Sequence, residues 1–100
     1  MDYKIVTREL DKSRSENKVL LKFNCKNVEP DGDLIALLTC EGERLGYVLV
    51  FDNRDKFINL SYNLGNITEH QLLFYRHIRN AEKFEDHFDP GPLAIATFHM

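Results

Sequence analysis

Residues 34–51 decide the fold, and they read LIALLTCEGERLGYVLVF. Residues 34–40 are apolar on both faces, which is typical of either a central strand or a short buried helix. We favour the strand, because the run is short and because residues 41–44 form a polar turn into a second apolar run. That second run, residues 45–51, is rich in β-branched and aromatic residues and therefore also predicts a strand.

Further strands are predicted on both sides of this pair, because apolar and polar residues alternate there. They cover residues 3–9, 19–25 and 57–64, and a last strand covers residues 93–99. The connections between the middle strands are short, and a parallel pair would need a crossover of about a dozen residues or more. We therefore expect the middle strands to form an antiparallel meander.

One long helix is predicted over residues 68–88. Thr68 and Gln71 have the spacing of a capping box, which marks a helix start. From there Phe74, Ile78, Ala81, Phe84 and Phe88 follow one another at steps of three and four residues, which is the spacing of an apolar helix face. The expected fold is α+β: a two-layer domain with a mainly antiparallel sheet of five or six strands and the helix packed on one face.

The composition fits a single domain over residues 1–100. Net charge is −3, from 13 basic and 16 acidic residues, which is too mild for a typical nucleic-acid binder. No apolar run approaches the roughly 20 residues of a membrane span. The first residues lack a secretory signal pattern, and we expect Cys25 and Cys40 to be free, so a cytoplasmic location is expected.

Catalytic patterns are absent from the sequence. Glycines never form a phosphate-binding loop, and no serine lies in a nucleophile elbow. His70 and His77 lie on one face of the expected helix but too far apart to share a metal without other ligands. We therefore expect no catalytic residues, no metal and no cofactor. Arg76 and Arg79 make only a weak patch, so nucleic acid is not the expected partner.

One group of charged residues stands out, and we call it the acidic rim. In an antiparallel meander alternate connections lie at the same end of the sheet, so the 27–33 loop and the 52–55 turn would meet. The carboxylates gathered there would be Glu29, Asp31, Asp33, Asp52 and Asp55. An acidic rim on a rigid sheet steers a basic partner surface toward it, so these residues are the predicted partner-binding site.

A second surface follows from the expected architecture. One helix covers one sheet face, and the other face would stay open and apolar, which invites another protein or a second copy. The predicted function is thus a small non-enzymatic protein-binding module, such as a regulator, an inhibitor or an immunity-type protein, that occludes its partner. The alternative is a small enzyme or ligand-binding domain with a pocket between helix and sheet, near His77, Glu82 and Asp86.

Overall fold

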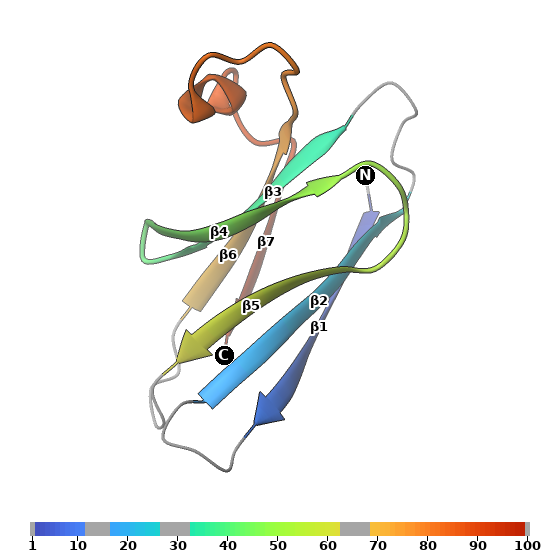
Figure 1. The fold of residues 1–100 in the computed structure, drawn as a ribbon, viewed down its shortest axis with the longest axis vertical. Coiled ribbons are helices and arrows are strands. Elements are labelled where there is room, and N and C mark those ends of the chain that lie inside the picture. Colours follow the sequence, from blue (N-terminus) through green and yellow to red (C-terminus); the bar gives the residue numbers. More distant parts are fainter. Residues whose placement is uncertain (1, 12–16, 27–32, 63–68, 100) are drawn as a thin grey trace.

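The computed structural model describes residues 2–11, 17–26, 33–62 and 69–99, which form seven strands and one 3₁₀ helix. The strands are β1 (Asp2–Asp11), β2 (Asn17–Lys26), β3 (Leu34–Cys40), β4 (Glu43–Val50), β5 (Lys56–Tyr62), β6 (Glu69–Arg76) and β7 (Ala94–His99), and the 3₁₀ helix η1 spans Phe84–Phe88. They make two antiparallel sheets, in the orders β1-β2-β5 and β4-β3-β6-β7. Both sheets are seen in Figure 1.

The two sheets enclose one apolar core. Every second residue of β3 and of its neighbours points into it, as the period of a strand requires. The buried members are Leu21, Phe23 and Cys25 from β2, Leu34, Ala36 and Leu38 from β3, Val50 from β4, Ile58 from β5, Leu72 and Phe74 from β6, and Ala96 from β7. Because both sheets supply these residues, the fold is a β-sandwich.

The β3–β4 hairpin turns on two residues, Glu41 and Gly42, which both have positive φ (52° and 81°). That is the backbone of a two-residue hairpin turn whose twist matches the flanking strands. The pairing register runs from Leu34 opposite Val50 to Cys40 opposite Glu43. The predicted strand at residues 34–40 is confirmed, and β3 lies between β4 and β6 inside its sheet.

The predicted helix over residues 68–88 is wrong, and with it the α+β fold class. Residues 69–76 form β6, and in the described part of the chain the only helical turn is η1. A capping box contributes roughly 1 kcal/mol, whereas burying one large apolar side chain contributes about 1.5–3 kcal/mol. As a strand, residues 69–76 bury Leu72 and Phe74 in the core and Tyr75 on the opposite face, so tertiary burial outweighs the local helix signal.

The predicted meander is also wrong, although the antiparallel pairing is confirmed. Only β3 and β4 are hydrogen-bonded neighbours in sequence order among the four middle strands, because β2 pairs with β5 instead. Residues 51–55 carry the chain from one sheet to the other, as the bend between β4 and β5 in Figure 1 shows. Because β3 is apolar on both faces, each face must be covered. The sheet β1-β2-β5 covers the face that points into the core.

We expect Phe74→Ala to lower the free energy of unfolding by about 3–5 kcal/mol, because it leaves a cavity in the middle of the core. Phe74 is fully buried, and its ring lies 5.9 Å from that of Phe23. The matched control is Phe57→Ala, since Phe57 is exposed and surface changes cost about 0.5 kcal/mol or less. Urea unfolding measures both, and equal losses would contradict this core.

Candidate functional site

The described carboxylates of the acidic rim lie at one end of the sandwich. Asp33 directly precedes β3, and Asp52 and Asp55 lie in the connection that follows β4. Leu34 is paired with Val50, so these two segments share an end of the ladder. Glu29 and Asp31 lie outside the described residues.

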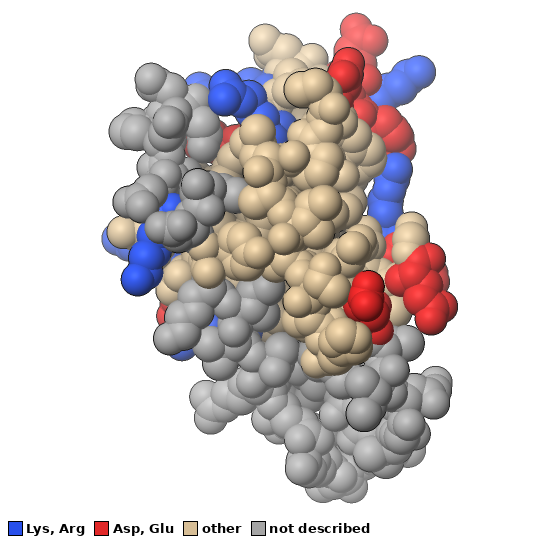
Figure 2. All heavy atoms as spheres, turned by 180° about the vertical axis from the view of Figure 1, so that it is seen from behind, with Lys and Arg blue, Asp and Glu red and all other residues tan. Residues whose placement is uncertain are grey.

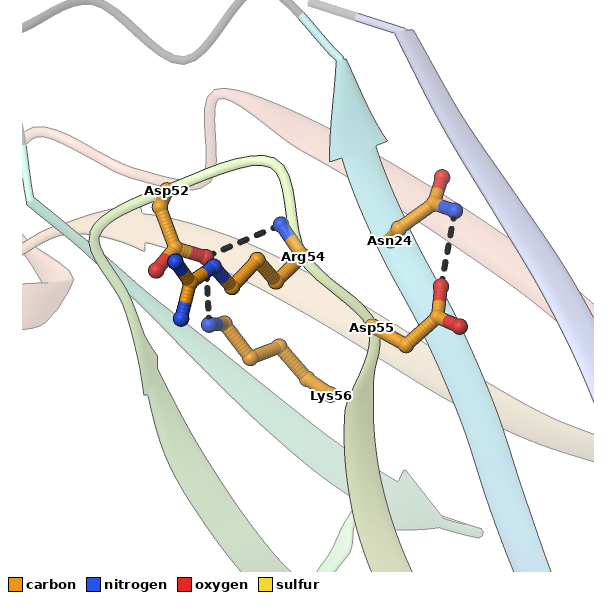
Figure 3. Close-up of polar contacts among 5 residues, drawn as sticks. All are labelled: Asn24, Asp52, Arg54, Asp55 and Lys56. Atoms are coloured by element: carbon orange, nitrogen blue, oxygen red, sulfur yellow. Dashed lines mark hydrogen bonds and ion pairs between the residues drawn. The ribbon is translucent and has the colours of Figure 1, made fainter.

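Each of these three carboxylates contacts polar or cationic groups of the chain itself, two of them as drawn in Figure 3. Asp52 Oδ1 accepts hydrogen bonds from Lys56 Nζ at 2.7 Å and from the Arg54 backbone amide at 2.9 Å. The Lys56 hydrogen bond is the main reason why the pKa of Asp52 is lowered, and the Arg54 amide adds to it.

Asp55 and Asp33 are similarly engaged. Asp55 accepts a hydrogen bond from Asn24 Nδ2 at 3.0 Å and lies 3.2 Å from Lys22 Nζ. Asp33 Oδ2 lies 3.6 Å from an Arg79 nitrogen and 4.0 Å from His77 Nδ1. The charges of Asp33, Asp52 and Asp55 are therefore paired within the molecule, and partner binding by the rim remains a prediction.

The alternative site near His77 is placed differently from the expectation. The His77 ring stacks on that of His87, with centroids 5.2 Å apart, and Nδ1 of His87 accepts a hydrogen bond from the Ile78 amide. Asp86 accepts one from the Lys83 amide, and Glu82 is exposed. The expected pocket lay under a helix, and residues 69–76 form a strand there instead.

Metal binding and thiol chemistry both depend on how the described His, Cys, Asp and Glu side chains are placed. No group of three His, Cys, Asp or Glu side chains lies close enough together in these ranges to hold a metal ion. Cys25 and Cys40 are both free, and Cys25 is buried. Burial raises the pKa of the Cys25 thiol to about 11, against a smaller lowering by Lys56. A protonated, buried thiol is a poor nucleophile.

A cluster that the sequence did not predict covers part of the second face of β3, and we call it the aromatic clasp. Its rings are Phe84 against Tyr47 (4.8 Å) and Phe88 against Tyr75 (4.7 Å). The Arg44 guanidinium lies over both phenylalanines, 4.7 Å from the Phe88 centroid. These contacts fix residues 77–93, which lie at the end of the sandwich where β6 ends and β7 begins (Figure 1).

Arg44 also forms an ion pair within the clasp. It donates a hydrogen bond to Glu85 Oε1 at 3.1 Å. The pKa of Glu85 is lowered, first by its own backbone amide and then by this Arg44 hydrogen bond. No sequence signal pointed to this contact, because Arg44 and Glu85 are 41 residues apart. Only the spacing of Phe84 and Phe88 hinted at a shared face.

The clasp explains why outward-facing residues of β3 are buried. Ile35 and Leu37 point away from the core, yet they are only 1% and 3% exposed. Their cross-strand neighbours are Tyr75 and Tyr47, which are the residues that Phe88 and Phe84 contact. The middle of this outer face is thus covered, while its edges on β4 and β7 are not.

The uncovered edge on β4 carries three apolar side chains in a row, which we call the β4 strip. Tyr47 and Leu49 follow one another at the strand period, opposite in direction to the core-facing Val48 and Val50, and Phe51 directly follows the end of β4. Their exposed fractions lie between 41 and 65%. Lys56 Nζ lies 4.5 Å from the centre of the Phe51 ring, so the strip ends beside the acidic rim.

Figure 2 views the molecule from the side of β7, which lies among the distant elements of Figure 1. A broad area without Lys, Arg, Asp or Glu occupies the middle of this view, and charged side chains lie along its margins.

The described ranges hold no helix that combines the length and apolar composition needed to cross a membrane.

Comparison of the chain with protein-family models, with curated proteins and with solved structures finds no match. The acidic rim and the β4 strip are therefore the features from which a function can be inferred.

We expect Arg44→Ala to loosen the clasp. Amide hydrogen exchange of residues 84–88 should accelerate by about two- to fivefold, since a cation–π contact at an exposed site contributes roughly 0.5–1 kcal/mol. Arg54→Ala, in the exposed 52–55 turn, is the control and should leave these amides unchanged. Unchanged exchange in Arg44→Ala would show that the clasp does not depend on the guanidinium.

A pH effect follows from Cys25. Between pH 9 and 11 the unfolded chain loses the thiol proton while the native state keeps it, so the free energy of unfolding falls over this range. Below pH 9 both states are protonated and the thiol has no effect. Urea unfolding across these pH values should show a shallower alkaline decline in Cys25→Ala than in the original chain. Parallel declines would refute the burial of this thiol.

Proposed function

We propose that this chain is a small protein-binding module whose contact surface is the β4 strip. The observation that carries the proposal is the joint exposure of Tyr47 and Leu49 on the edge strand β4 and of Phe51 directly after it. Aromatic side chains are enriched in the centres of protein interfaces, where they dominate the binding energy. The strip therefore fits an apolar surface of another protein.

The charges around the strip support an apolar rather than an electrostatic contact. Lys56 and Asp52 form a close pair beside Phe51, and Arg44 is engaged by Glu85. These charges are paired with one another, and the side chains of the strip are uncharged, so association through the strip should survive high salt. Binding through the acidic rim would weaken as salt screens the charges.

The proposed action is occlusion: the module would cover an apolar site on its partner and so regulate or inhibit it. The two free cysteines are consistent with a reducing compartment, and we propose the cytoplasm. The alternative of an enzyme or ligand-binding domain near His77 loses its support, because the helix that was to form one wall of its pocket is not present in residues 69–76.

The test compares capture of proteins from an extract of the cells that express the chain. We expect the immobilised chain to retain a defined protein at both low and high salt. The double variant Leu49→Ser, Phe51→Ser, which keeps the clasp residue Tyr47, should lose at least about nine-tenths of this capture, which is a cost of roughly 1.4 kcal/mol or more.

The matched control is Phe57→Ser, which removes an equally exposed aromatic ring from the outer face of the other sheet. It should capture as much as the original chain. Capture that vanishes at high salt would indicate that the acidic rim binds the partner. Capture unaffected by the double variant would contradict binding through the β4 strip.

A further inference from the structure

The strand β7 is an edge strand without the usual protection against pairing. Its six residues, Ala94–His99, include no Asp, Glu, Lys, Arg or Pro. Its register with β6 is continuous from Glu69–His99 to Phe74–Ala94, with no bulge. Proteins commonly guard edge strands with charges, prolines or bulges, because an open edge is a template for another strand.

Two of the other three edges, β1 and β4, are guarded. The sequence of β1 contains both acidic and basic residues, and its register is interrupted between Glu9 and Asp11. In β4 a bulge leaves Leu45 between the pairs Leu38–Gly46 and Thr39–Arg44. The third edge, β5, pairs with β2 in a continuous register and has its only charged residue, Lys56, at its first position.

Apolar side chains next to the β7 edge are also exposed. Leu93 and Ile95 are each about half exposed, at 55 and 48%. Ile95 lies on the outer face, because its neighbours Ala94 and Ala96 face the core. A strand added at this edge would cover these side chains and supply partners for the edge amides.

We propose that β7 pairs antiparallel with β7 of a second copy, so that the two four-stranded sheets become one eight-stranded sheet. An antiparallel pair of identical strands is two-fold symmetric and satisfies both open edges at once. The axis would pass beside Thr97, so that Thr97 of one copy lies opposite Thr97 of the other, because opposite residues of an antiparallel pair have their side chains on the same face. Because residues 94–98 carry no charge, the pairing brings no like charges together.

One contact already present at this edge is compatible with the pairing. The Tyr3 hydroxyl donates a hydrogen bond to the Ile95 carbonyl oxygen at 3.0 Å, and the Tyr3 ring stacks on Phe74. A carbonyl oxygen has two lone pairs, so it can accept a second hydrogen bond from an added strand. Tyr3 thereby holds β1 to the β7 side of the sandwich without closing the edge.

The test is the oligomeric state of the purified full chain, measured by sedimentation velocity over a range of concentrations. We expect a mass of two chains at high concentration, with slower amide exchange in residues 94–99 than at low concentration. Thr97→Lys should return the protein to one chain, because it sets two lysines close to the symmetry axis. Ile95→Lys makes the same change at the neighbouring exposed position, in case one variant fails to fold.

Leu49→Lys is the matched control, because it adds the same charge to the outer face of the opposite edge strand. It should leave the dimer intact. A single chain at every concentration would overturn the inference, as would a dimer that persists in both β7 variants or dissociates in Leu49→Lys instead. The measurement needs no other protein, so its failure would leave the proposed function of the β4 strip untouched.

Discussion

The structure depends on the burial of β3 on both of its faces. Leu34, Ala36 and Leu38 face the core between the sheets, and Ile35, Leu37 and Thr39 face the other way, yet all six are buried. A strand of this kind must have a layer above it and a layer below it, because exposing either face would cost several kilocalories per mole. The second sheet supplies one layer and residues 77–93 contribute to the other.

A short segment, η1, covers the middle of the outer face of the sheet that contains β3. Phe84 and Phe88 lie four residues apart in a single 3₁₀ helix, and their rings are 5.3 Å apart. The Arg44 guanidinium lies over both rings and forms an ion pair with Glu85. A short segment can cover only the middle of a four-stranded sheet, and the apolar side chains nearer its edges therefore stay exposed.

That incomplete cover shapes both functional proposals. The β4 strip and the β7 edge lie at opposite margins of one sheet, so a strand-paired dimer would leave both β4 strips available. In the acidic rim, by contrast, Asp33, Asp52 and Asp55 are paired with lysines, an arginine and amide groups from within the chain. Apolar contact, rather than long-range attraction, is the property that the described surface offers a partner.

The sequence by itself determined most of the strands. Alternation or apolar runs located β1, β2, β3, β4, β5 and β7, because the strand period is a local property of the chain. Short connections predicted antiparallel pairing, and the apolar character of residues 34–40 correctly predicted a strand buried on both faces. It also predicted that Asp33 and the 52–55 turn share one end, but from a meander that is wrong; they share it because both flank the β3–β4 pair.

Only the tertiary structure decided the rest. Residues 69–76 carry a helix start signal and an apolar spacing compatible with either conformation, and the choice of a strand depends on a place beside β3 that no local pattern encodes. The pairing of β2 with β5 and the contact of Arg44 with Phe84, Phe88 and Glu85 join residues far apart in the chain. Such long-range contacts form because they remove apolar surface from water. Local sequence patterns do not show which distant segments will pack against each other.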